Sequence, residues 1–239
     1  MPEGDTIFRA AQTLHRVLAG KIVTRFESVY PALTRIADDR PVVGRTIESV
    51  AARGKHLLIA FSGDLILRTH MRMNGSWHIY PAAARWQRPA RDMRVLVGTS
   101  DAVAVAFNVP VAEFLTARDL ARHRELKALG PDLLADSFDR AEVLRRMRRS
   151  GRDPIGDVLL NQRVLAGIGN VLKCEILFLA GIEPFTPTSS LDDARLNDLI
   201  DVAINQLRSN VLTPMQTLHP GVGRRTTKNL NPGDRKSVV

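Results

Sequence analysis

The first residues after the initiator methionine carry the clearest chemical potential in the chain. Pro2 and Glu3 follow Met1 directly, so removal of Met1 would leave a proline secondary amine beside a carboxylate. An α-amino group has a pKa of about 8, against about 10.4 for lysine, and more of it is therefore uncharged near neutral pH. Such an amine attacks carbonyl-like carbons and forms Schiff bases. The alternative is that both residues only open a helix, because proline and acids suit a helix N-terminus.

Two stretches of the first half place cations where a phosphate could bind. Lys55 follows Gly54 at the start of an apolar run. It is either a positioned cation that reaches a phosphate or an ordinary solvated lysine. Further on, His70, Arg72 and Met73 fall in an expected loop. A methionine on such a loop can enter a base stack and hold it open. The alternative is that the methionines of this loop pack in the core.

A third candidate lies in the second half, in the run Gln162-Arg163-Val164-Leu165-Ala166-Gly167-Ile168-Gly169-Asn170. It joins two apolar segments through a turn with two glycines, which let a backbone come close to another chain. The amides that open the next helix favour an anion, and a phosphate is the expected guest. Asn170 adds a side-chain donor. The alternative is a helical corner whose glycines serve only tight packing.

Composition narrows the class of partner. The 239 residues are 44% hydrophobic, enough for one large or two ordinary domains, and 34 Lys+Arg against 25 Asp+Glu give a net charge of +9. This surplus favours a polyanion. We expect nucleic acid, no membrane partner and a cytoplasmic protein, because no apolar run approaches ~18 residues and no secretory signal opens the chain. One cysteine, Cys174, excludes an internal disulfide.

The elements expected to position these residues change along the chain. Apolar spacing predicts a helix that starts after Asp5 as its N-cap and ends near Gly20. From Ile22 to Phe107, short strands predict an antiparallel sandwich or barrel. Ser62-Gly63-Asp64 reads as a hairpin turn. Beyond about Leu115 the pattern is helical, with helices predicted at 139–149, 155–164, 170–181 and around 196–207.

Taken together, the motifs resemble one family, formamidopyrimidine-DNA glycosylase and endonuclease VIII, in their order and spacing: Pro2-Glu3-Gly4, Gly54-Lys55-His56, His70-Met71-Arg72-Met73-Asn74-Gly75 and the glycine turn. The resemblance covers roughly residues 1–230. It implies a multi-domain α+β protein, with an N-terminal helix and antiparallel β-sandwich over 1–124 and an all-α helix–two-turn–helix DNA-binding domain over 125–218. Residues 219–239 read as a basic tail.

The resemblance also implies an activity and a role for each matching residue. The enzyme would be a bifunctional DNA glycosylase and AP lyase of base-excision repair, acting as a monomer on duplex DNA in the bacterial cytoplasm. Pro2 would attack C1′ of the damaged nucleoside, with Glu3 as acid/base group, and the strand would be nicked by β,δ-elimination. Lys55 and Asn170 with Gly167 and Gly169 would bind phosphate. His70 and Arg72 belong to the expected DNA-binding loop, and Met73 would fill the gap left by a flipped base.

The chain departs from the family pattern in ways that bear on its substrate. Gly4 in place of leucine resembles the endonuclease VIII branch, and residues 109–114 lack the arginine–phenylalanine pair of the other branch. Both favour oxidised pyrimidines over oxidised purines. Thr6 replaces a second glutamate. The family's four-cysteine zinc finger is impossible with Cys174 alone, so we expect no cofactor and explain its absence by truncation.

Three functions remain open at this point. The first is the glycosylase/lyase, with oxidised purines as the alternative substrate. The second is a damaged-DNA-binding protein with weak or no turnover, because the finger is missing. The third, a helical RNA binder associated with the ribosome, leaves Pro2 and Glu3 unexplained.

Overall fold

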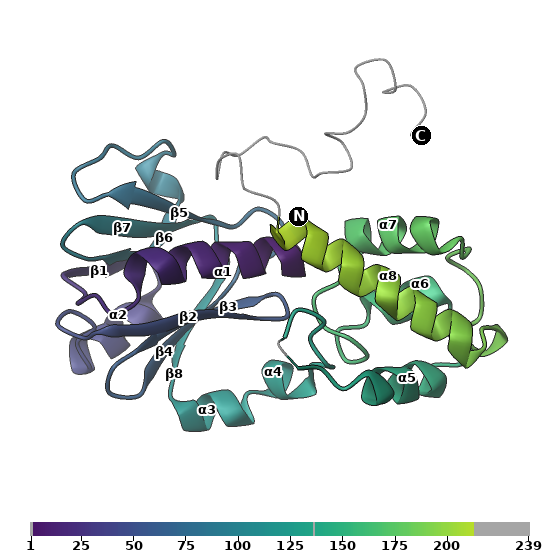
Figure 1. Ribbon diagram of the computed structural model, residues 1–239. Helices are drawn as coiled ribbons and strands as arrows, with labels where there is room; N and C mark the ends of the chain where they lie inside the picture. Colours follow the sequence, from purple (N-terminus) through teal and green to yellow (C-terminus); the bar gives the residue numbers. More distant parts are fainter. Residues whose placement is uncertain (1, 136, 213–239) are drawn as a thin grey trace, which may run out of the picture.

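The computed structural model describes residues 2–135 and 137–212. The predicted tail, 219–239, lies outside the described residues. Two bodies stand side by side, a strand-rich one that contains the N-terminal helix and a helical one (Figure 1). The helices are α1 (Gly4–Leu18), α2 (Pro31–Asp39), α3 (Ala117–Arg122), α4 (Arg124–Ala128), α5 (Arg140–Arg149), α6 (Ile155–Leu160), α7 (Asn170–Ala180) and α8 (Asp193–Leu212), with single 3₁₀ turns η1 (Ala90–Asp92) and η2 (Thr188–Ser190).

The strands form two antiparallel sheets of four, as the sandwich prediction requires. One sheet has the order β1 (Arg25–Ser28), β6 (Met93–Gly98), β7 (Ala102–Phe107) and β5 (Ser76–Pro81). The other has the order β2 (Ile47–Arg53), β3 (His56–Phe61), β4 (Leu65–His70) and β8 (Val111–Leu115). The predicted turn at Ser62-Gly63-Asp64 joins β3 to β4 as an antiparallel hairpin, with φ of 77° at Gly63.

The main apolar core lies between these sheets and α1. Alternate residues of each strand face inward, and the buried stripe of α1, which includes Ile7, Leu14 and Leu18, closes the core. A second core holds the helical body together, from Leu133 to Leu207. The predicted boundary at residue 124 falls between the last residue of the first core, Phe114, and the first of the second.

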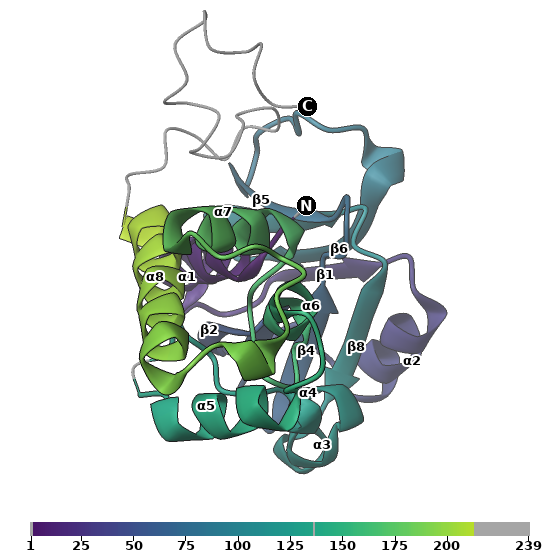
Figure 2. The ribbon, with the colours of Figure 1, turned by 90° about the vertical axis from the view of Figure 1, so that its right-hand side faces the viewer.

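Helix α1 does not begin as predicted. It starts at Gly4 with Glu3 as its N-cap residue, and Asp5 lies inside the first turn. The carboxylate of Asp5 instead accepts hydrogen bonds from its neighbour's amide, Thr6 N at 2.7 Å, and from Asn210 Nδ2 of α8 at 3.0 Å. Asp5 therefore joins α1 to α8, which runs past the start of α1 in both views (Figures 1 and 2).

Helix α6 is shorter than predicted, ending at Leu160 and not near Val164. The next residues use their side chains to build a turn. Asn161 Oδ1 accepts from Arg163 N at 3.0 Å, and Gln162 Nε2 donates to the carbonyl of Leu160 at 2.9 Å. Asparagine side chains that bond the backbone in this way compete with helix continuation.

Helices α5, α7 and α8 agree with the prediction to within a few residues, and Asp139 caps α5 by accepting from Glu142 N at 2.9 Å. None of the helices in the described residues is long and apolar enough to cross a membrane.

Candidate active site and nucleic-acid interface

The residue after Pro2 is anchored on the helical body. Glu3 is fully buried, although glutamate is among the residues least often buried. Its Oε1 accepts from Val171 N and its Oε2 from Leu172 N, each at 3.0 Å. These amides open α7, where a helix favours negative charge. Glu3 is therefore held at the start of α7 by a charge-assisted pair of bonds.

Three glycines make this close approach possible. A Cβ on Gly169 would lie 2.3 Å from Cδ of Glu3, and one on Gly4 would lie 2.8 Å from Cα of Gly167. Gly4 N also donates to the carbonyl of Gly167 at 2.8 Å. Gly167 has a φ of 103°, which a residue with a side chain rarely adopts.

The prediction of what this turn binds is thus corrected in part. The sequence predicted that the glycines admit another chain and that the helix amides bind a phosphate. In the structure two of those amides bind Glu3 of the same chain. Asn170 stays exposed beside them, and its Oδ1 accepts from Lys173 Nζ at 2.8 Å.

Gln162 organises the glycine turn, a role that the sequence did not reveal. Its Oε1 accepts from Gly167 N at 3.0 Å and its Nε2 donates to the carbonyl of Ile168 at 2.8 Å. One side chain thereby satisfies two backbone groups within the turn. A glutamine two residues after an apolar helix and five residues before the first of two glycines was the available signal.

The two front-half motifs lie on connections between strands. Lys55 follows Gly54 in the hairpin from β2 to β3, and a Cβ on Gly54 would lie 3.3 Å from Cβ of Ala166. The hairpin tip therefore adjoins the glycine turn. The loop after β4 divides its methionines: Met71 is buried in the core, whereas Met73 is 63% exposed. Of the two alternatives for this loop, core packing holds for Met71 and exposure holds for Met73.

His70 is held in one orientation at the start of that loop. Its Nδ1 accepts from Arg72 N at 3.1 Å, and Arg72 itself has a φ of 50°. An Nδ1 that accepts leaves Nε2 to carry the proton of the neutral ring. Burial, followed by the charge of Arg72, lowers the pKa of His70 to about 4. His70 is therefore a neutral hydrogen-bond donor at physiological pH.

A buried arginine on the same strand as His70 was missed by the sequence analysis. Arg68, 3% exposed, pairs with Glu113 of β8 and Glu125 of α4, and its Nε donates to His56 Nδ1 at 3.2 Å. The His56 ring meets that of His70 edge-on, with centroids 4.7 Å apart. Burial, followed by the charge of Arg68, lowers the pKa of His56 to about 2. No local motif marks these partners, because they come from four separate elements.

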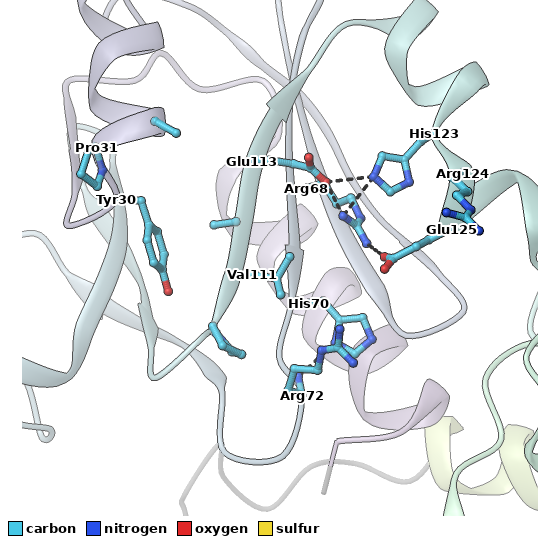
Figure 3. A pocket seen from close by; sticks show the side chains of 13 residues that line it. Tyr30, Pro31, Arg68, His70, Arg72, Val111, Glu113, His123, Arg124 and Glu125 are labelled. Atoms are coloured by element: carbon cyan, nitrogen blue, oxygen red, sulfur yellow. Dashed lines mark hydrogen bonds and ion pairs between the residues drawn. The ribbon is translucent and has the colours of Figure 1, made fainter.

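An open pocket of about 580 Å³ is bordered by Arg68, His70, Glu113 and Glu125 (Figure 3). Its walls come from the start of α2, the end of β4, β8 and α4, represented by Tyr30, His70, Val111 and Arg124. His70 and Arg72 lie together at its lower side, with the Arg68 pairs above them. Pro2 and Glu3 are not among its lining residues.

Two family models match the chain. The formamidopyrimidine-DNA glycosylase N-terminal domain matches residues 1–110, and the formamidopyrimidine-DNA glycosylase H2TH domain matches residues 129–219. The chain belongs to the formamidopyrimidine-DNA glycosylase family. It is therefore a member of a family of DNA-repair glycosylases and lyases.

Similar proteins of this family carry endonuclease names. "Probable endonuclease 8 2" of Streptomyces coelicolor is 39% identical over 217 residues, which are 90% of this chain and 76% of that protein. "Endonuclease 8" of Pectobacterium carotovorum is 34% identical over 201 residues, 83% of this chain and 75% of the relative. "DNA-(apurinic or apyrimidinic site) lyase Nei2" of Mycolicibacterium smegmatis is 32% identical over 194 residues, with 81% and 72% covered.

Solved structures of the family share the fold. The Lactococcus lactis Fpg in complex with abasic-site DNA has a TM-score of 0.76 at 24% identity, covering 87% of this chain and 78% of that one. A MutM complex with DNA that contains carbocyclic 8-oxo-G also has a TM-score of 0.76 at 24% identity, covering 88% and 81%. The predicted sandwich with a helix–two-turn–helix body is confirmed by this agreement.

The neutral histidines predict a pH dependence of stability. Both folded-state pKa values lie below the ordinary 6.5, so the unfolded chain binds more protons once the pH falls below 6.5. The free energy of unfolding that the two neutral histidines contribute is fully present above pH 6.5 and is lost progressively as the pH falls toward 4. For His56 the slope reaches ~1.4 kcal/mol per pH unit. Urea unfolding at pH 7, 6 and 5 measures it, and a His56→Gln variant with the same slope as the parent would contradict it.

Proposed function

We propose that this chain is a bifunctional DNA glycosylase and AP lyase whose nucleophile is the amine of Pro2. The observation that carries the proposal is the anchoring of Glu3 on α7, because it fixes the adjacent Pro2 in place. An N-terminal residue without such an anchor would fray. Fixed geometry between amine and sugar is worth several kcal/mol in an attack of this kind.

The reaction would proceed in two stages. The Pro2 nitrogen attacks C1′, the glycosidic bond breaks, and the base leaves with the bonding electron pair. Breaking this bond develops positive charge on the sugar, which the Glu3 carboxylate stabilises electrostatically. The nitrogen then gives up its proton and its electron pair forms a double bond to C1′, while the C1′–O4′ bond breaks and O4′ takes up a proton, so the sugar ring opens to an iminium. The iminium acidifies the C2′ protons, so a base removes one and the 3′ phosphate is expelled. A second elimination releases the 5′ phosphate and completes β,δ-elimination.

The remaining residues would grip the DNA around the flipped nucleoside. Lys55, Arg72 and Asn170 supply cationic and amide donors for phosphates, and His70 donates from Nε2 without carrying charge. Extrusion of the base costs roughly a few kcal/mol. Exposed Met73 would then occupy the emptied place in the stack, as apolar wedges do.

Oxidised pyrimidines are the proposed substrates, and duplex DNA is the partner. The endonuclease 8 names of the relatives support this choice, as does the sequence Val109-Pro110-Val111-Ala112-Glu113-Phe114, which lacks the arginine–phenylalanine pair. The solved neighbours are described as complexes with abasic or damaged DNA, which supports the same partner. We further propose that the protein acts as a monomer in the bacterial cytoplasm and without a cofactor.

Borohydride trapping tests this function. Protein whose proline terminus is confirmed by mass should form a covalent complex with abasic or thymine-glycol duplex in the presence of borohydride. Pro2→Gly keeps an α-amine but lacks the ring that fixes its direction, so trapping should fall about 100-fold or more. The exposed Pro41→Gly should trap like the parent. Binding without trapping by the parent protein would contradict the lyase and favour the binding-only alternative.

A further inference from the structure

A single carboxylate links the proposed phosphate site at Lys55, in the first half of the chain, to the one at Asn170, in the second half. Asp132 lies in the segment that follows α4, outside every motif used above. Its Oδ1 accepts from Leu134 N at 3.0 Å and so closes a turn within its own segment. Its Oδ2 accepts from Gly54 N at 2.6 Å, 78 residues earlier in the chain. A bond of a carboxylate to a backbone amide is among the stronger hydrogen bonds in proteins.

The amide that Asp132 holds belongs to the hairpin that carries Lys55. Gly54 is buried and has a φ of 58°, a left-handed conformation that sets the direction in which the chain leaves toward Lys55. A Cβ on Gly54 would lie 3.3 Å from Cβ of Ala166 and 3.4 Å from Cδ1 of Leu129. Packing therefore limits the position of the hairpin tip, and the Asp132 bond fixes its orientation.

Asp132 is also tied to the glycine turn by its backbone. It forms a parallel bridge with Ala166, and Ala166 N donates to the carbonyl of Pro131 at 2.9 Å. Gly130 N donates to the carbonyl of Gln162 at 2.8 Å. The segment 130–132 is thus attached by its backbone to the turn that precedes Asn170 and by its side chain to the hairpin that precedes Lys55.

We propose that Asp132 is a positioning residue that sets Lys55 at a fixed place relative to Asn170 and the start of α7. This inference rests on the proposed function, in which both residues bind backbone phosphates of one damaged strand. Two phosphate-binding residues bind one strand together only where the distance between them matches the spacing of the phosphates along that strand. A rigid link between them removes the cost of ordering the hairpin on binding.

The sign of the effect separates this role from simple electrostatics. Asp132 is an acid in a chain of net charge +9. If it acted only through its charge, its removal would strengthen attraction to DNA. If it positions Lys55, its removal weakens binding, because the gain from one less negative charge is outweighed by a misplaced phosphate contact.

The experiment is a double-mutant cycle on the full chain. Kd for a duplex with a tetrahydrofuran abasic analogue is measured at several salt concentrations for Asp132→Asn, Lys55→Ala and the double variant. We expect Asp132→Asn to raise Kd about tenfold and to lower the slope of log K against log salt by up to ~0.9, the share of one phosphate contact. The double variant should bind like Lys55→Ala alone, because the two effects are not additive.

Two further variants keep the test decisive. Asp139→Asn makes the same charge-removing substitution at a carboxylate that also accepts from a backbone amide, at the start of α5, and should leave Kd within about twofold of the parent. Asp132→Glu keeps the charge but displaces the acceptor, so it should weaken binding as Asp132→Asn does. It also serves if Asp132→Asn does not fold.

Three results would overturn or redirect the proposal. Tighter binding by Asp132→Asn, or unchanged binding by Asp132→Glu, would contradict a positioning role. Additive effects in the cycle would show that Asp132 acts independently of Lys55 and would also overturn it. Unchanged binding by Lys55→Ala would instead contradict the phosphate role of Lys55 in the proposed function and would remove the basis of the inference with it.

Discussion

Replacement of Gly169 by alanine is expected to lower base excision by about 100-fold or more, which corresponds to ~2.7 kcal/mol of transition-state stabilisation. The added Cβ would lie 2.3 Å from Cδ and 2.5 Å from Oε1 of Glu3, so the carboxylate has to leave the start of α7. Pro2 moves with it, because the two residues are adjacent. Single-turnover excision from a thymine-glycol duplex measures the loss.

Gly151→Ala is the matched control for that change. Gly151 also lies in the helical body, but its nearest neighbour to an added Cβ is the carbonyl of Arg148 at 3.3 Å, which a small shift accommodates. It should excise like the parent. Full activity of Gly169→Ala, with an unchanged Tm, would show that activity does not depend on the anchoring of Glu3 on α7.

Glu3→Gln is expected to separate the two stages of the reaction. The substitution is isosteric, yet it removes the negative charge and turns an N–H toward one of the α7 amides, leaving a buried donor unpaired at a cost of about 1–3 kcal/mol. Excision of a damaged base should fall about 100-fold or more, because the positive charge that develops on the sugar loses its partner. Nicking of a preformed abasic site should fall less, since no glycosidic bond has to break there.

Two measurements on the same preparation check this separation, one with thymine-glycol duplex and one with a preformed abasic duplex. Glu175→Gln on α7, whose carboxylate accepts from Gln206 at 2.9 Å, makes the same change away from the N-terminus and should alter neither rate. Equal losses in both reactions of Glu3→Gln would contradict a charge-stabilising role in the first stage.

Local patterns allowed much of the fold to be predicted. Strand β3 and its hairpin to β4 were predictable because a short apolar run ends at Ser62-Gly63-Asp64, residues that suit a tight turn. Helix α7 was predictable because glycines stand at both of its ends. Helix α6 was predicted too long, since its apolar residues continue to Val164 while the side chains of Asn161 and Gln162 bend the backbone.

The sequence named candidate site residues, but it did not reveal the contacts among them. The sequence identified Glu3 and the glycine turn as separate features, and only the fold shows that one is the anion bound by the other. The roles of Arg68 and Asp132 depend on partners more than 40 residues away and on burial. Neither a distant partner nor the burial of a side chain leaves a local sequence pattern, so the sequence alone could not have revealed the roles of these two residues.

The most direct test of the account is the site of covalent capture. The parent protein, with Met1 removed, is trapped with borohydride on abasic duplex, digested with nuclease and protease, and analysed by mass spectrometry. The account predicts the reduced sugar remnant on the N-terminal peptide, at the nitrogen of Pro2. A remnant carried by a lysine peptide, including that of Lys55, with an unmodified N-terminus would contradict it.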